Sequence, residues 1–235
     1  MKKIGIIFAM REELEEFLKH LQVLKEYEIF DLLFYEGVIH GVEVILVESG
    51  VGKVNASRST QILIDNMIVD YIINVGVAGG VDSRLQVLDV VIGESLVQHD
   101  FDITAFNHPK GYVPKVGVYL KSDEYLLRIA NEVFKKNTSY RVFNGVIASG
   151  DIFCTDRKMS EKIHNKFGSL CVEMEGASIA QVCVLSHIPF LVIRSISDTL
   201  DGDNKMVYEE FLKHSSEVAT FMLEEILKKI GKEKF

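Results

Sequence analysis

Residues 4–21 read IGIIFAMREELEEFLKHL, an apolar stretch of strand length that passes directly into a charged stretch with helical spacing. Ile4–Phe8 is a continuous apolar run, and in Arg11–Leu21 the apolar residues recur at intervals of three and four. Lys2 and Lys3 imitate the start of a signal peptide, but the apolar run is too short and ends among glutamates. The stretch therefore predicts a buried strand that leads into a helix.

The same unit of strand and helix recurs along the chain. Strands that alternate with helices predict a largely parallel sheet covered on both faces. Tyr27–Val47 departs from this pattern, because two strand-like runs separated by Ile39-His40-Gly41 indicate an inserted antiparallel hairpin. The other expected strands are Val42–Val47, Tyr71–Val75, Val87–Ile92, Val142–Ala148 and Phe190–Ile196, and the other expected helices are Val54–Asn66, Asp123–Phe134, Gly176–Leu185 and Tyr208–Lys229.

Composition limits the kind of protein this is. A chain of 235 residues that is 48% hydrophobic and has no linker-like tract predicts one domain over residues 1–235. Scattered basic residues and a net charge of −8 argue against a nucleic-acid partner. Three cysteines without Cys-x-x-Cys spacing favour a reducing compartment. Since no apolar segment approaches the roughly 20 residues that span a bilayer, we expect a cytoplasmic protein with no membrane partner.

Glycines and carboxylates gather where the expected strands end. In open α/β sheets the ligand lies beyond the carboxyl ends of the strands, so these residues are the first candidates for a site. They are Met10–Glu13, Gly76–Gly80, Ser149–Phe153, Glu173–Glu175 after the short run Leu170–Val172, and Ser197-Asp198.

Charged residues in or beside the apolar runs have two readings each. Arg194 interrupts the run FLVIRSIS and needs a carboxylate partner, because an unpaired buried charge is costly. Strand alternation places Arg194 and Asp198 on one side, where a structural ion pair is as good an explanation as a functional one. Glu173 and Glu175 fit the first turn of a solvated helix, but two carboxylates at this spacing also suit a ribose diol.

Several common motifs are missing from the sequence. Ser49–Lys53 lacks the spacing of a P-loop, and G-x-G-x-x-G does not occur, so neither an NTPase nor a dinucleotide enzyme is supported. The glycine turns are either structural or let backbone amides approach a small ligand. The seven histidines show no H-x-x-x-H pattern, and no G-x-S-x-G occurs, so we expect no metal and no cofactor. By elimination, carboxylates are the expected general acid and general base.

The most specific signal is the order of five segments: Gly5–Glu13, Ser49–Val54, Gly76–Gly80, Val172–Glu175 and Arg194–Asp198. Together they resemble the bacterial 5′-methylthioadenosine/S-adenosylhomocysteine nucleosidases of the purine nucleoside phosphorylase superfamily. The resemblance covers the chain from Lys3 to the C-terminal helix. It implies a single-domain, three-layer α/β fold with a mixed, partly barrel-like central sheet flanked by helices, and a homodimer.

The resemblance also implies roles for individual residues. Glu13 matches the residue that activates the attacking water, with Arg194 close to it and holding its pKa down. Asp198 matches the acid that protonates adenine N7, and burial is expected to raise its pKa. Glu175 matches the ribose ligand, with Met174 against the sugar.

The remaining implied positions form the walls of the nucleoside pocket. Phe153 stacks on adenine and the backbone at Cys154 reads its edge. Many members carry serine where this chain has Val77, and phenylalanine is common where it has Tyr208. The full set of further substrate-binding positions is Met10, Val51 and Tyr208 at the 5′-alkylthio group, Val77, Ala78, Gly79, Ile152, Glu173 and Ser197, with Ile103, Phe106 and Pro114 contributed by the partner subunit.

The expected reaction is hydrolysis of the N-glycosidic bond of methylthioadenosine and S-adenosylhomocysteine, extending to 5′-deoxyadenosine and 6-amino-6-deoxyfutalosine, with release of adenine. A phosphorylase is the nearest rival, but such enzymes carry an arginine before the glycine-rich turn, where this chain has Asn74-Val75-Gly76-Val77. An aminodeoxyfutalosine nucleosidase of menaquinone synthesis is not separable by sequence. A non-catalytic nucleoside sensor would leave the set of carboxylates unexplained.

Overall fold

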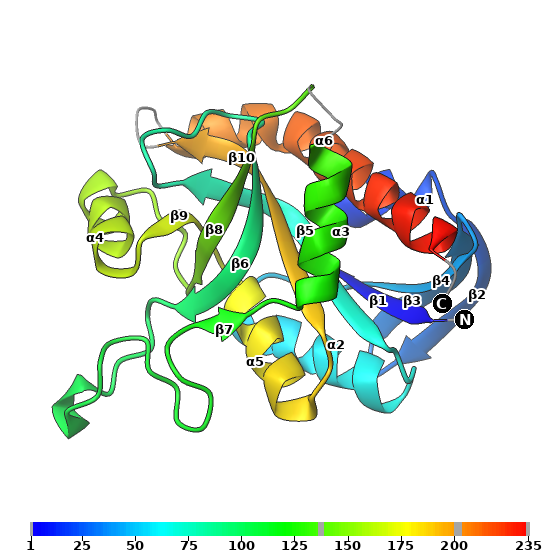
Figure 1. Cartoon of the computed structure of the whole chain (residues 1–235), viewed down its shortest axis with the longest axis horizontal. Helices are drawn as coiled ribbons and strands as arrows, with labels where there is room; N and C mark the ends of the chain where they lie inside the picture. The colour runs from blue at the N-terminus through cyan, green and yellow to red at the C-terminus, as the bar shows by residue number, and fades with distance from the viewer. Residues whose placement is uncertain (1, 136–138, 200–203, 234–235) are drawn as a thin grey trace.

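The computed structural model describes residues 2–135, 139–199 and 204–233, with the backbone alone for residues 204–210. A large sheet runs through the molecule, and helices lie on both of its sides (Figure 1). The elements in chain order are β1 (Lys3–Phe8), α1 (Arg11–Leu18), β2 (Gln22–Ile29), β3 (Leu32–Ile39), β4 (Val42–Glu48), α2 (Lys53–Asp65), β5 (Tyr71–Gly80), β6 (Val90–Gln98), the 3₁₀ turn η1 (Thr104–Phe106), β7 (Leu120–Lys121), α3 (Glu124–Phe134), β8 (Val142–Ser149), α4 (Arg157–Phe167), β9 (Ser169–Glu173), α5 (Gly176–Ser186), β10 (Phe190–Thr199) and α6 (Asn204–Lys232).

The sheet is mixed and closes on itself at one end. Its strand order is β10-β6-β8-β9-β5-β1-β4-β3-β2, and β10 also pairs with β5, so that five strands form a closed ring. β1 is parallel to β4 and β5, and β10 is parallel to β5 but antiparallel to β6. The predicted α/β fold with a mixed, partly barrel-like central sheet is confirmed.

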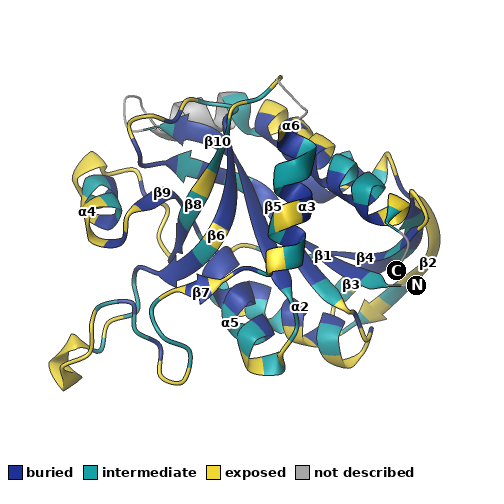
Figure 2. Cartoon of the chain, viewed as in Figure 1, coloured by how far each residue is buried: buried dark blue, intermediate teal, exposed yellow. Residues whose placement is uncertain are grey.

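Apolar residues of the central strands face two cores. Along β1, Ile6 belongs to the core beneath α1, α3 and α6, whereas Ile7 belongs to the core beneath α2 and α5. Along β10, Ile193 and Val192 divide between the two cores in the same way. Figure 2 shows the central strands buried on both faces, which is why they read as continuous apolar runs. Among the described residues, no helix has the length and apolar character required to cross a membrane.

The predicted hairpin is present, with a third strand added. β3 and β4 pair through the turn at His40 and Gly41, both with positive φ, and β2 pairs on the other side of β3. α4 was not expected, because its sequence is largely polar and only Ser160, Ile163 and Phe167 are buried.

Several expected boundaries differ from the observed ones, and two of them differ for a reason that the structure shows. Gly76–Gly80 was read as a turn after a strand, but it continues β5, because β10 pairs with β5 as far as Gly80. The strand expected at Val87–Ile92 begins at Val90, because a turn precedes it in which the Asp89 carboxylate accepts a hydrogen bond from the Gln86 amide.

Candidate active site

A cavity opens beyond the carboxyl ends of β1, β5, β8, β9 and β10. Backbone and side chains from these strand ends, together with the turn before α2, form its walls. The described residues that line it are Ala9, Met10, Glu13, Val51, Val77, Ala78, Gly79, Ile152, Phe153, Cys154, Val172, Glu173, Met174, Glu175, Ser197 and Asp198.

The first buried carboxylate, Glu13, is fixed by backbone amides. It lies in the first turn of α1, and one of its oxygens accepts hydrogen bonds from the amides of Ala9 at 3.0 Å and Met10 at 3.2 Å. The other oxygen accepts one from the amide of Val77 at 3.1 Å. A Cβ atom on Gly76 would lie 2.7 Å from Glu13 Oε1, so glycine is what allows β5 to approach this carboxylate.

The environment of Glu13 differs from the sequence-based expectation. Burial raises its pKa, and Arg194 together with the three amides offsets only part of that rise. The expectation that Arg194 would hold the pKa below its ordinary value was wrong, because Glu13 is only 3% exposed and desolvation outweighs the attraction.

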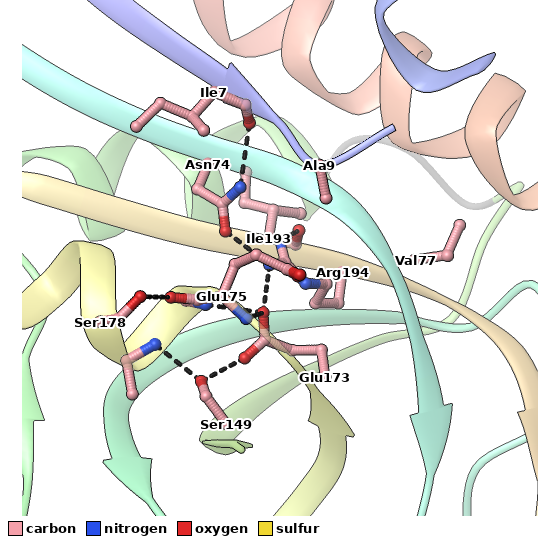
Figure 3. A network of polar contacts seen from close by, with 12 residues as sticks. Ile7, Ala9, Asn74, Val77, Ser149, Glu173, Glu175, Ser178, Ile193 and Arg194 are labelled. Atoms are coloured by element: carbon pink, nitrogen blue, oxygen red, sulfur yellow. Dashed lines mark hydrogen bonds and ion pairs between the residues drawn. The ribbon is translucent and has the colours of Figure 1, made fainter. Parts of the chain in front are cut away.

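Arg194 forms its ion pair with Glu173, and not with Asp198 as strand alternation had suggested. Its buried guanidinium forms an ion pair with Glu173, donates to Asn74 Oδ1 and donates to the Ile193 carbonyl at 3.0 Å (Figure 3). The alternation that placed Asp198 on its side is broken by a bulge between Ile196 and Asp198. Among the described residues, Glu173 lines the cavity and Arg194 does not.

Glu173 is committed to holding the start of α5. One of its oxygens accepts from the amides of Glu175 at 3.1 Å and Gly176 at 2.7 Å, while the other is bonded to Ser149. The sequence had left open a solvated first turn of a helix, but Glu173 is buried and holds the start of α5 from the end of β9. Arg194 completes the set of groups around this carboxylate (Figure 3).

Glu175 is the other carboxylate, just beyond the end of β9. Its Oε1 accepts a hydrogen bond from the Gly52 amide at 2.7 Å. Burial, followed by repulsion from Glu173, raises the pKa of Glu175 to about 7. At neutral pH it therefore exchanges readily between a hydrogen-bond acceptor and a donor.

Asp198 is the fourth buried carboxylate on the cavity wall, after Glu13, Glu173 and Glu175. Its Oδ1 accepts a hydrogen bond from the Ser197 hydroxyl at 2.8 Å, and the side chain lies against Gly79 of β5. Burial raises the pKa of Asp198 to about 6, against the opposing effect of Ser197. This direction agrees with the sequence-based expectation for the pKa of Asp198.

Comparison with known proteins places the chain in a family. The sequence model of the phosphorylase superfamily matches residues 3–229 of this chain. The 5′-methylthioadenosine/S-adenosylhomocysteine nucleosidase of Geobacillus sp. (strain WCH70) is 41% identical over 231 residues, a match that covers 96% of this chain and 100% of that protein. The chain belongs to the phosphorylase superfamily, in the family of these nucleosidases.

Solved structures of this nucleosidase family share the fold over nearly the whole chain. The nucleosidase of Neisseria meningitidis, in complex with methylthio-immucillin-A, has a TM-score of 0.94 at 35% identity and covers 97% of this chain and 99% of that one. A futalosine hydrolase of Helicobacter pylori strain 26695 has a TM-score of 0.91 at 36% identity and covers 96% of this chain and 97% of that one.

Most of the nucleosidase-like positions named from sequence lie together on the cavity, and Ala9 and Val172 join them. Ile103, Phe106 and Pro114 are not among the described residues that line it. They belong to the excursion between β6 and β7, which projects from the body of the molecule, with Phe106 75% exposed (Figure 1). The side chain of Tyr208 lies outside the described residues.

Sequence reasoning missed the supporting polar residues. Asn74 was considered only as the place where a phosphorylase would differ, yet its amide joins Arg194 to the Ile7 carbonyl. A polar residue inside the apolar run YIINV was the available signal. Ser149, which joins Glu173 to the Ala177 amide, was named among the strand-end candidates but was given no role, because it reads as part of a turn.

Proposed function

We propose that this protein hydrolyses the N-glycosidic bond of 5′-methylthioadenosine and S-adenosylhomocysteine and releases adenine. The observation that carries the proposal is a set of three buried carboxylates with raised pKa values on one cavity, Glu13, Glu175 and Asp198, two of which, Glu13 and Asp198, can serve as base and acid. Glu13 lies against Gly76 and Asp198 lies against Gly79 of the same strand, β5. Cleavage of a glycosidic bond requires an acid and a base of this kind on one cavity.

In the proposed mechanism Glu13 is the general base. Three amide donors orient its carboxylate, and a pKa above the ordinary glutamate value makes it a better proton acceptor at neutral pH. It takes a proton from water as the water attacks the anomeric carbon. Arg194, one step removed behind Glu173, adds positive charge near the base without bonding to it directly.

Asp198 is the proposed general acid. Cleavage sends the electron pair of the C–N bond into adenine, and a proton delivered to N7 neutralises the charge that collects there. A pKa of about 6 keeps the proton within reach at neutral pH, and the Ser197 hydroxyl orients the carboxyl group.

The proposed binding positions follow from the walls of the cavity. Glu175 and Met174 would hold the ribose, and the carboxylate would exchange its bond to the Gly52 amide for the sugar hydroxyls. Phe153 and Cys154 would receive adenine. Met10 and Val51 would contact the 5′-alkylthio group. The backbone amide of Val77 donates to Glu13, at a position where serine is common in the family.

We also propose a cytoplasmic homodimer in which each single-domain chain lends Ile103, Phe106 and Pro114 to its partner's pocket. The support is the exposure of Phe106 on an excursion that leaves the body of its own chain. A fully active monomer in sedimentation analysis at assay concentration would contradict this arrangement.

The substrate range is proposed to include 5′-deoxyadenosine and 6-amino-6-deoxyfutalosine. The likeness to a futalosine hydrolase supports the second of these. Phosphorolysis is the alternative reaction, but Asn74 stands before the glycines of β5, and its amide is engaged with Arg194 and the Ile7 carbonyl.

The deciding experiment measures adenine release from methylthioadenosine, S-adenosylhomocysteine and aminodeoxyfutalosine, with and without phosphate. Hydrolysis predicts turnover that is independent of phosphate and yields free sugar. Strict dependence on phosphate would establish a phosphorylase, and binding without any release would establish a sensor.

A further inference from the structure

A second polar cluster lies beside the cavity, apart from the proposed catalytic carboxylates, and joins three segments next to its walls. The Lys53 ammonium pairs with Asp100 Oδ1 at 2.7 Å, and the other oxygen of Asp100 accepts from the Asp151 amide at 3.0 Å. The Asp151 carboxylate in turn accepts from the Lys53 amide at 2.8 Å. Lys53, Asp100 and Asp151, which we term the rim triad, thus form a closed cycle of bonds.

Each member of the rim triad belongs to a different segment beside the cavity. Lys53 begins α2 and follows Val51 by two residues, and Asp151 directly precedes the wall formed by residues 152–154. Asp100 follows β6 at the root of the excursion that carries Phe106. None of the three is among the described residues that line the cavity, so their influence on a ligand passes through these segments.

The rim triad is more shielded than an ordinary surface ion pair. The Lys53 and Asp100 side chains are 17% and 19% exposed, against 39% and 82% for Arg58 and Asp31, a pair that also involves α2. Burial works to raise the pKa of Asp100, but the bonds from Lys53 and Asp151 leave that pKa below its ordinary value. The pair therefore interacts more strongly than the small contribution typical of exposed pairs.

Glycines at the rim permit this close approach. Gly52 has a φ of +102°, and a Cβ atom there would lie 3.2 Å from the Asp151 carboxylate. A Cβ atom on Gly150 would lie 2.4 Å from the buried His99 ring. Side chains at either position would push the three segments apart.

We propose that the rim triad is a positioning device that sets the distance between the wall at Val51 and the wall at residues 152–154. The proposal rests on the proposed function, in which these walls receive the 5′ group and adenine. Both walls touch the substrate away from the bond that breaks, so they contribute equally to the ground state and the transition state. Loosening them should raise KM and leave kcat nearly unchanged.

The test compares Asp100→Asn, Lys53→Met and the double variant with the wild-type protein, using methylthioadenosine. We expect each single variant to raise KM roughly tenfold, with kcat within about twofold. The double variant should resemble the singles, because either substitution already opens the cycle. Lys53→Arg keeps the positive charge, so its KM should lie much closer to the wild-type value than the KM of Lys53→Met. It is also the variant to measure if Lys53→Met fails to fold.

The matched control is the double variant Arg58→Met/Asp31→Asn, which removes an exposed ion pair between α2 and the turn that joins β2 to β3. It should leave both kinetic parameters unchanged. If the rim variants lower the melting temperature while KM stays at the wild-type value, or if the two single effects multiply in the double variant, the proposed positioning role is wrong.

Failure of the proposed function gives a different result. A wild-type protein that releases no adenine refutes the hydrolase assignment, and calorimetric binding of methylthioadenosine then measures the same walls without turnover. Roughly tenfold weaker binding in Asp100→Asn would still support the rim triad, and unchanged binding would overturn it.

Discussion

Replacing Asp198 by asparagine is expected to stabilise the protein and to inactivate it at the same time. Asp198 is 3% exposed, and its ionised form has lost most of its hydration. Asparagine has nearly the same shape, accepts the hydrogen bond from the Ser197 hydroxyl and carries no charge. The substitution therefore removes the cost of a buried charge together with the proton that adenine needs.

The size of this gain follows from the pKa. Burial raises the pKa of Asp198 from 3.8 to about 6. Since each pKa unit corresponds to about 1.4 kcal/mol, ionised Asp198 costs the folded protein about 3 kcal/mol at neutral pH. For a chain of this length, that free energy corresponds to a melting temperature roughly 6 to 12 °C higher in the variant.

The gain must depend on pH in a defined direction. Below about pH 3 the carboxyl group is protonated in both the folded and the unfolded chain, so wild type and variant should have similar stability. As the pH rises through the folded pKa of about 6, the wild-type protein alone loses the stability that the protonated form provided. The difference between the two proteins should therefore grow between pH 4 and 6 and stay constant above.

Calorimetric melting of both proteins from pH 4 to 8, paired with adenine release, measures both consequences. Turnover should fall roughly 10²- to 10⁴-fold. A nitrophenyl riboside, whose leaving group needs no proton, should recover much of that loss. A variant that is less stable than wild type at pH 7.5, or a gain that is equal at pH 4 and pH 8, would refute the assigned cost of the Asp198 charge.

Three further predictions concern the rest of the site. Glu13→Gln should lower turnover at least roughly 10²-fold while nucleoside affinity persists in calorimetry, and the nitrophenyl riboside should not rescue it; normal turnover would show that another group is the base. Glu175→Gln should raise KM as well as lower kcat, because a ribose ligand acts in both states; an effect on neither in steady-state kinetics would undo its assignment. Gly76→Ala places a Cβ atom 2.7 Å from Glu13 Oε1, so kcat should fall roughly tenfold or more through displacement of the base, and unchanged kcat would show that the carboxylate has room to move.

Much of the architecture was accessible from local pattern. Ile4–Phe8 and Phe190–Ile196 read as strands because their residues are apolar on both faces, and β1 and β10 occupy them. Helix α4 was not predicted, because three buried side chains in a polar stretch leave too weak a helical periodicity of apolar residues. The continuation of β5 through Gly76–Gly80 was not predicted, because glycines in a sequence suggest a turn and only the pairing with β10 makes them part of a strand.

The sequence by itself determined which side chains stand at the strand ends, because strand direction and residue order are local properties of the chain. The sequence alone therefore predicts that Glu13, Glu175 and Asp198 lie at one edge of the sheet. Tertiary structure alone decided their partners and their charge. Strand β10 has a bulge between Ile196 and Asp198, and Arg194 forms its ion pair with Glu173 and not with Asp198. Burial raises the pKa of Glu13 despite the nearby positive charge of Arg194. Desolvation and contacts between distant segments depend on the packing of the whole chain, and no short stretch of sequence encodes them.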